Sequence, residues 1–185
     1  MYAIDTRGHG KSPRGTASFT ITQFSEDLYA FMDLHGLERA NILGFSDGGN
    51  IALLFALRHP ERVKKLILNG ANLDPKGVKA SVQIPIVIGY KIASFFAKFS
   101  REAKKNAEVL ALMVNEPHIQ VEELEGLKVR TLVIAGTDDM IRDDHTKLIF
   151  KSLPDSELAI IPGDHFIANK NPAEFNRAVE KFLDT

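Results

Sequence analysis

Short apolar runs typical of strands alternate with longer amphipathic runs typical of helices along most of this chain. This alternation restricts the possible folds more than any other feature of the sequence. Strands that alternate with helices form a parallel sheet, because each helix returns the chain to the edge at which the previous strand began. Five runs are predicted as strands: residues 1–5, 40–45, 63–71, 128–137 and 156–162. We therefore expect an α/β protein with a mostly parallel sheet flanked by helices.

The predicted helices are supported by periodicity and by capping residues. Apolar residues recur at spacings of three and four after Thr20, Gln23 completes a candidate capping box with it, and Gly36 can end the helix. The segment GGNIALLFALR is apolar nearly all round, so we expect a buried helix. The compact apolar run 40–45 is typical of a strand buried on both faces. Two further helices are predicted over residues 143–153 and 171–184.

One long segment interrupts the alternation. Residues 72–127 contain no convincing strand, and helices are predicted near 78–99 and 101–114. A crossover between parallel strands needs only about a dozen residues, so this segment is an insertion. We predict that residues 1–71 and 128–185 form the core and that 72–127 form a helical lid over the carboxyl ends of the strands, where open α/β sheets bind ligands. The alternative is a helical decoration that only shields the core.

Composition excludes several classes of partner. The chain has 23 lysine and arginine residues against 24 aspartate and glutamate residues, a net charge of −1, so nothing favours nucleic acid. It has no cysteine, which excludes disulfides and cysteine metal ligands. The first ten residues lack the regions of a signal peptide, and lysines interrupt the most apolar stretch, residues 82–99. We expect a cytoplasmic protein without stable membrane insertion.

A serine stands among glycines in the segment LGFSDGGNIAL, residues 43–53. The pattern G-x-S-x-G places Ser46 after a predicted strand and before a predicted helix, which is the setting of a nucleophile elbow. Bulk at the flanking positions of such a turn would clash, which accounts for Gly44, Gly48 and Gly49. The alternative is an inert turn serine, because a pattern of five residues is too short to identify a nucleophile by itself.

Partners for a nucleophilic serine occur later in the chain. A serine needs a base, and the base needs a group that orients it. Asp138 and Asp139 follow the predicted strand 128–137, and His165 follows the predicted strand 156–162. Strand ends of a parallel sheet meet at one edge, so these side chains are expected close to Ser46. Individually, such an aspartate is more often a helix cap and such a histidine more often an ordinary loop residue.

Four segments resemble the α/β-hydrolase family, in particular its lid-bearing esterase, lipase and lysophospholipase-like members. They are YAIDTRGHGKS, NILGFSDGGNIAL, LVIAGTDDMI and IIPGDHF, which are similar to the family's fourth strand, elbow, acid loop and histidine loop. The resemblance implies an α/β-hydrolase fold with Ser46 as nucleophile, Asp139 as acid and His165 as base. The family's acid usually stands three residues after the glycine that closes its strand, which favours Asp139 and leaves Asp138 as the alternative. The backbone N–H of Asp47 is the implied oxyanion donor.

The resemblance begins at the family's fourth strand, so the chain is N-terminally truncated relative to the family. The loop that normally supplies the second oxyanion N–H is then missing, and the loss of one such donor typically costs about 100- to 1,000-fold in kcat. We therefore expect low esterase activity. We also expect the vacant place in the sheet to close, either because residues 1–5 pair with 40–45 or because that edge forms a homo-oligomer.

The implied reaction is acyl transfer to water with no metal or organic cofactor. We expect a small-molecule carboxylic ester as substrate. One alternative is a catalytically silent hydrolase-fold fragment or binding protein, and another is a carbon–carbon bond hydrolase or perhydrolase on the same fold. Phe95, Phe96 and Phe99 are expected to form the core of the lid rather than an acyl pocket, and His9 is expected to shape a turn.

Overall fold

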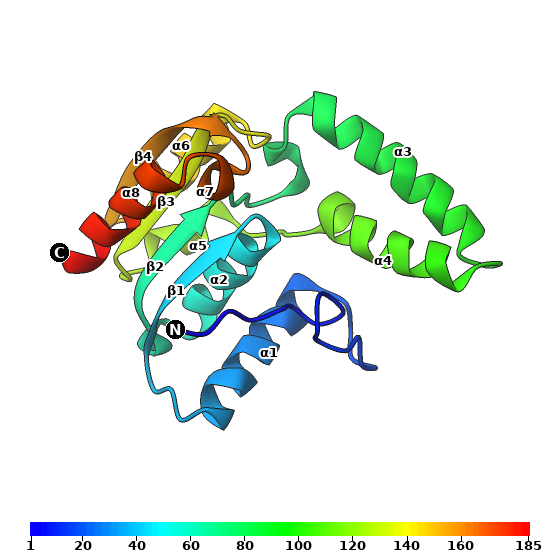
Figure 1. The fold of residues 1–185 in the computed structure, drawn as a ribbon, viewed down its shortest axis with the longest axis horizontal. Helices are drawn as coiled ribbons and strands as arrows, with labels where there is room; N and C mark the ends of the chain where they lie inside the picture. The colour runs from blue at the N-terminus through cyan, green and yellow to red at the C-terminus, as the bar shows by residue number, and fades with distance from the viewer.

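The structure, a computed structural model, describes all 185 residues, and Figure 1 shows an α/β core from which a helical hairpin projects. The core contains four parallel strands in the order β1-β2-β3-β4. They are β1 (Ala40–Phe45), β2 (Val63–Asn69), β3 (Thr131–Asp138) and β4 (Ser156–Asp164). The predicted parallel α/β sheet is therefore confirmed, with four strands in place of the five expected.

Helices cover both faces of this sheet. Successive strand residues point to opposite faces, and Leu66 and Ile67 accordingly belong to two separate apolar clusters. The larger cluster joins β2 and β3 to α1, α2, α5 and α6, and the smaller joins them to α7 and α8. The helices are α1 (Ile21–Leu34), α2 (Asp47–Arg58), α5 (Val121–Glu125), α6 (Asp143–Ser152), α7 (Ile167–Lys170) and α8 (Pro172–Asp184), with short 3₁₀ turns at Pro60–Arg62 and Pro75–Gly77.

The predicted helix boundaries agree with the structure. The side chain of Thr20 caps α1 by accepting a hydrogen bond from the Gln23 N–H at 3.1 Å. Gly36 follows α1 with a φ of 62°, a conformation that glycine adopts at little cost. Helix α2 is buried as expected, with Leu53, Phe55 and seven buried residues in all.

The predicted first strand is wrong. Residues 1–5 are extended but pair with no strand, and the ring of Tyr2 packs against Phe31 of α1 with centroids 5.4 Å apart. Strand β1 therefore pairs with β2 alone and forms one edge of the sheet. The prediction that 40–45 is buried on both faces also fails, because Leu43 and Phe45 are 48% and 37% exposed. These five residues are exposed, so little burial holds them against β1, and the backbone groups of that edge are left unpaired.

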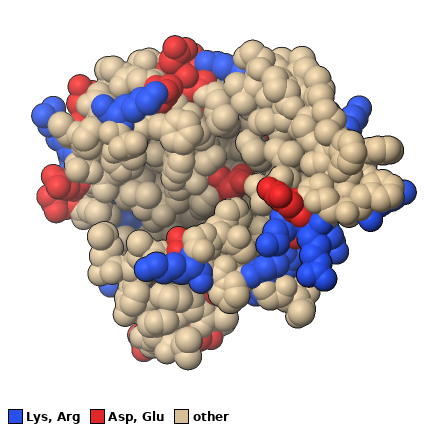
Figure 2. Space-filling view, turned by 45° about the vertical axis from the view of Figure 1, so that its right-hand side comes forward, with Lys and Arg blue, Asp and Glu red and all other residues tan.

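The insertion contains the helices that the sequence predicts. Helices α3 (Ala80–Phe96) and α4 (Arg101–Asn115) form an antiparallel hairpin beside the core (Figure 1). The space-filling view shows that the molecule is hollowed near the middle of the face it displays (Figure 2). None of the described helices is long and apolar enough to cross a bilayer.

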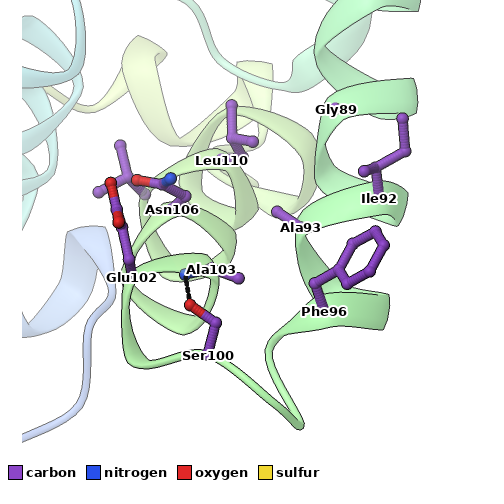
Figure 3. Close-up of a pocket in the computed structure, with 10 residues that line it drawn as sticks. Gly89, Ile92, Ala93, Phe96, Ser100, Glu102, Ala103, Asn106 and Leu110 are labelled. Atoms are coloured by element: carbon purple, nitrogen blue, oxygen red, sulfur yellow. Dashed lines mark hydrogen bonds between the residues drawn. The ribbon is translucent and has the colours of Figure 1, made fainter.

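The hairpin does not have the expected aromatic core. Phe95, Phe96 and Phe99 are 66%, 52% and 79% exposed, and no residue of α3 is buried. Phe96 lies along the groove between the two helices and stays about half exposed, whereas Phe95 and Phe99 do not line that groove. Between α3 and α4 lies a mainly apolar groove of about 720 Å³, whose wall includes Ile92 and Leu110 (Figure 3).

Candidate active site

Ser46 occupies the sharp turn between β1 and α2. Its φ of 54° and ψ of −122° make it the one residue other than glycine with a positive φ. Such a conformation costs on the order of 1–3 kcal/mol and persists only where the surrounding structure enforces it. Here the Ser46 N–H donates to the carbonyl of Asn69 at 2.8 Å, and its own carbonyl accepts from Gly49 at 2.8 Å. The serine side chain caps nothing, so the hydroxyl is available for other contacts.

The glycines around Ser46 have different reasons to be glycine. A Cβ at Gly44 would lie 2.1 Å from the carbonyl oxygen of Gly48, so no side chain fits there. A Cβ at Gly49 would come within 3.0 Å of Ala71, which is tight. The expectation of a clash at Gly48 is wrong, because a Cβ there would meet nothing within 4 Å. The close approach of the strand and helix is concentrated at Gly44.

Asp139 and His165 form a buried pair at the ends of β3 and β4. The distance between His165 Nδ1 and Asp139 Oδ1 is 2.7 Å, and the two side chains are 6% and 1% exposed. The same carboxylate accepts hydrogen bonds from the backbone N–H groups of Ile141 at 3.0 Å and Gly136 at 3.2 Å. Asp138, the alternative acid, is exposed and lies opposite Asp164 in the register of the two strands. The structure thus places Asp139, and not Asp138, against the imidazole.

The contacts of Asp139 determine its protonation. Burial alone would raise its pKa, but the hydrogen bond from His165 and those from Ile141 and Gly136 outweigh burial and lower the pKa below its usual range. The carboxylate is therefore charged at neutral pH. A charged carboxylate on Nδ1 fixes the tautomer in which Nε2 of His165 is unprotonated and can accept a proton.

The other side of His165 faces the nucleophile turn. Its ring packs against Phe45, the residue before Ser46, with centroids 4.9 Å apart. Gly70 approaches the ring so closely that a Cβ there would lie 2.6 Å from Cε1. Nε2 is buried and has no hydrogen-bond partner. The expected hydrogen bond between Ser46 and His165 is thus absent, although the two residues lie at the same edge of the sheet; such contacts are often loose before substrate binds.

Asp47 is the first residue of α2. Its backbone N–H precedes the first complete helical turn and has no intrahelical acceptor, as an oxyanion donor requires. Its side chain is half-buried. Burial raises the pKa of this carboxyl group, and the charges of His9 and His165 act in the opposite direction. His9 is exposed and stacks on Phe19 at a centroid distance of 5.8 Å.

Polar contacts that the sequence did not predict, called the polar clamp below, join the start of the insertion to α2 and α6. Buried Asn50 of α2 donates to the side chain of Asn72 at 3.0 Å and accepts from the Asn72 N–H at 2.9 Å. His145 Nε2 accepts from the Leu73 N–H at 2.9 Å, and burial lowers the pKa of this histidine. The signal in the sequence was Asn50 itself, a polar residue within an otherwise apolar helix.

The start of the insertion is also joined to the loop that carries the acid. Val78 and Ile141 form an antiparallel β-bridge, and the Lys79 N–H donates to the carbonyl of Met140 at 2.8 Å. The Ile141 N–H in turn donates to Asp139, so a continuous series of backbone contacts joins the start of the insertion to the acid. No group of three or more His, Cys, Asp or Glu side chains is arranged to hold a metal ion.

Comparison with known proteins gives the family. A model of the α/β-hydrolase fold matches residues 1–84. A protein of Caulobacter sp. named "Putative carbamate hydrolase RutD" is 31% identical over 97% of this chain and 78% of its own length. The chain belongs to the α/β-hydrolase family. A second protein with the RutD name, from Caulobacter segnis, is 26% identical over the whole chain and 81% of its own length.

Solved structures show the same α/β-hydrolase fold. The enol-lactonase from Burkholderia xenovorans superposes with a TM-score of 0.79 at 21% identity and covers 98% of this chain and 79% of its own. The meta-cleavage product hydrolase of Pseudomonas fluorescens gives a TM-score of 0.76, also at 21% identity, over 97% of this chain and 78% of its own. At this level of identity the likeness establishes the fold alone. Family membership makes hydrolysis the activity to expect of this chain.

Proposed function

We propose that this chain is a serine hydrolase that cleaves carboxylic esters through an acyl-enzyme on Ser46. The observation that carries the proposal is the strained turn at Ser46, which is the one positive φ outside glycine. Strain of this kind is concentrated at functional sites. The buried pair of Asp139 and His165, 2.7 Å apart at the same edge of the sheet, supports the same proposal.

In the proposed mechanism, Ser46 Oγ attacks the ester carbonyl while Nε2 of His165 takes its proton. Asp139 holds the imidazole and stabilises its charged form. His165 then returns the proton to the leaving alcohol, which departs and leaves the acyl group on Ser46. A water molecule, activated by the same nitrogen, hydrolyses the acyl-enzyme and regenerates the serine. The N–H of Asp47 at the start of α2 would stabilise the oxyanion in both steps.

The class of substrate rests on the names of relatives and on the insertion. The RutD proteins are named for carbamate hydrolysis, and the lactonase for an enol-lactone. Both names describe a carbonyl carbon bonded to a heteroatom, the type of centre that a serine nucleophile attacks. Carboxylic esters belong to the same class. We assign residues 72–127 as a lid above this site, because the segment that leads into the hairpin is hydrogen-bonded to Asn50 of α2 and to His145 of α6.

A fluorophosphonate probe tests the nucleophile directly. The parent chain is expected to be labelled and Ser46→Ala is not, because phosphonylation requires an activated serine. Turnover of p-nitrophenyl acetate by the parent, lost in the same variant, would extend the result from reactivity to catalysis. If the parent resists the probe while circular dichroism shows it folded, the proposed function is wrong.

The second candidate is a hydrolase-fold protein that binds a ligand without turning it over. It is favoured by the unpartnered Nε2 of His165, since the proton transfer in the proposed mechanism needs contact between this nitrogen and Ser46. The probe separates the two, because a silent protein leaves Ser46 unlabelled. Carbon–carbon bond hydrolysis and perhydrolysis both require the same activated serine, so labelling does not separate them from ester hydrolysis and turnover of esters must be measured as well.

A further inference from the structure

The carboxylate of Asp47 has no partner within the chain. Asp47 immediately follows Ser46 as the first residue of α2, with consecutive Cα atoms about 3.8 Å apart, so its backbone lies next to the proposed nucleophile. The side chain is half-buried, and no hydrogen bond contributes to its charge state. Removing a carboxylate from water without supplying a partner is unfavourable. A ligand bound in the site would supply the partner that this carboxylate lacks.

The surroundings of Asp47 are polar on the side of the site. The charges of His9 and His165 both act on this carboxyl group, so it lies within electrostatic range of the loop after residues 1–5 and of the proposed base. His165 is 95% buried, with a relative exposure of 5%, and its Nε2 also lacks a partner. Asp47 follows β1 and His165 follows β4, both at the carboxyl edge of the sheet, and a bound substrate would supply the partner that the Asp47 carboxylate and Nε2 of His165 lack.

A second carboxylate reinforces the negative charge. Glu116, which follows α4, accepts a hydrogen bond from the Ile21 N–H at 2.6 Å and is thereby held at the start of α1. Burial is the main cause that raises the pKa of Glu116, and the charge of Asp47 raises it further. The two carboxylates are thus close enough to affect each other. No lysine or arginine contributes to the charge state of Asp47.

The surface view agrees with this description. Acidic side chains are recessed in the hollow near the middle of the displayed face, and the lysine and arginine side chains on this face lie outside it (Figure 2). A hollow of this kind with acidic groups at its floor and low-dielectric walls concentrates the field and attracts cations.

We propose that Asp47 is a specificity-determining residue that binds a cationic group on the acyl part of the substrate, an ammonium one or two carbons from the scissile carbonyl. This inference rests on the proposed function, since it assigns a substrate class to the same serine. The ammonium group is placed this close to the scissile carbonyl because Asp47 directly follows the nucleophile. A neutral acyl group of the same shape would leave the carboxylate desolvated and unpaired, so the site would discriminate against it.

Two isosteric esters test the proposal. In p-nitrophenyl 3-aminopropanoate an ammonium group stands where p-nitrophenyl butanoate has a methyl group. The readout is the ratio of kcat/KM for the cationic ester to that for the neutral ester. We expect this ratio to fall about tenfold in Asp47→Asn, because a half-exposed charge pair is weaker than a fully buried one. Any effect of the substitution on the backbone N–H, and any difference in intrinsic ester reactivity, cancels in the comparison.

Matched variants sharpen the test. Asp47→Glu keeps the charge and is expected to retain part of the preference. Asp143→Asn removes an exposed carboxylate at the first residue of α6 and is expected to leave the ratio unchanged. An unchanged ratio in Asp47→Asn overturns the proposal. So does an equal loss for both esters accompanied by a shifted pH profile, which would mean that Asp47 acts on His165 and not on substrate.

Labelling rates separate this inference from the proposed function. Phosphonate probes that carry the same ammonium or methyl group report on the attack by Ser46 even where turnover is slow. Reaction with both probes at rates whose ratio does not depend on Asp47 would refute the cation preference and leave the serine hydrolase intact. Failure of both probes to label Ser46 would refute the hydrolase, and the inference with it.

Discussion

The two halves of the candidate site differ in how firmly they are held. In the acid and base half, the carboxylate of Asp139 contacts three donors, and both side chains are almost fully buried. In the nucleophile half, Ser46 and Asp47 follow the edge strand β1, and neither side chain has a hydrogen-bond partner. The first half is preorganised by hydrogen bonds between side chain and backbone. In the second, backbone hydrogen bonds from Ser46 to Asn69 and from Gly49 to Ser46 hold the strained turn.

The sheet accounts for part of this difference, because Asp139 follows a central strand, whereas Ser46 and His165 follow the edge strands β1 and β4. Strand β3 has a neighbour on each side, so the loop that carries Asp139 starts from a fixed position. Strand β1 has only β2, and Leu43 and Phe45 on it are partly exposed. Edge strands present unpaired backbone groups and are less well supported. The turn at Ser46 is instead held by its two backbone hydrogen bonds, and the absence of a Cβ at Gly44 lets α2 pack closely against β1.

The largest expected effect tests the half that is held by hydrogen bonds. Asp139→Asn leaves the shape but lets the side chain stabilise the wrong tautomer of His165, so the rate of fluorophosphonate labelling is expected to fall by a factor on the order of 1,000–10,000. The comparison variant Asp138→Asn changes an exposed neighbour and is expected to react at nearly the parent rate. A larger loss in Asp138→Asn would reverse the assignment of the acid.

A pair of glycine variants compares close packing on the two sides of the site. Gly70 has a φ of 65° and touches the ring of His165, so Gly70→Ala is expected to lower the free energy of unfolding by about 1–3 kcal/mol. Gly48 lies in the open first turn of α2, where alanine is a better helix former, so Gly48→Ala is expected to raise it by up to about 1 kcal/mol. Urea denaturation measures both. Equal destabilisation by the two variants would contradict the difference in packing.

The pH dependence of stability tests how firmly Asp139 is held. Its pKa is lower in the folded chain than in the unfolded chain, so the unfolded chain binds more protons at acid pH. The resulting stabilisation is complete above the unfolded pKa and is lost as the pH falls through the folded pKa, at about 1.4 kcal/mol for each unit of difference. Unfolding free energies measured from pH 7 down to pH 3 are expected to fall less steeply in Asp139→Asn. A parallel decline in both chains would mean that Asp139 contributes no such linkage.

Local patterns were sufficient to predict much of this molecule. The alternation of runs predicts the parallel sheet and the capping residues predict α1, while the resemblance to the family, through its usual spacing from Gly136, favours Asp139 over Asp138. Each of these features depends on neighbours within a few residues. The predicted roles of Ser46, Asp139 and His165 remain predictions, which the labelling experiments address.

The features that were missed depend on contacts between distant segments. Residues 1–5 have the composition of a strand but lack a partner, and sequence cannot show which strands will be neighbours. The space around Gly48 depends on what lies across the turn, not on the motif. The clamp between Asn50 and Asn72 joins residues that no periodicity relates. In each case tertiary packing, rather than local propensity, decides the outcome.

The smallest expected effect concerns the open edge. Since residues 1–5 do not cover β1, the remaining prediction is that this edge pairs with another copy of the chain, which would bury Leu43 and satisfy exposed backbone groups. Light scattering at micromolar concentration is then expected to show a dimer or larger assembly. Leu43→Lys places a charge on the edge and is expected to raise the dissociation constant about tenfold. Leu148→Lys changes a comparably exposed leucine on α6, at 39%, and is expected to have no effect. Equal weakening by both lysine variants would mean that general surface hydrophobicity drives the association. A clean monomer in the parent chain would show that β1 is stable with β2 as its one neighbour.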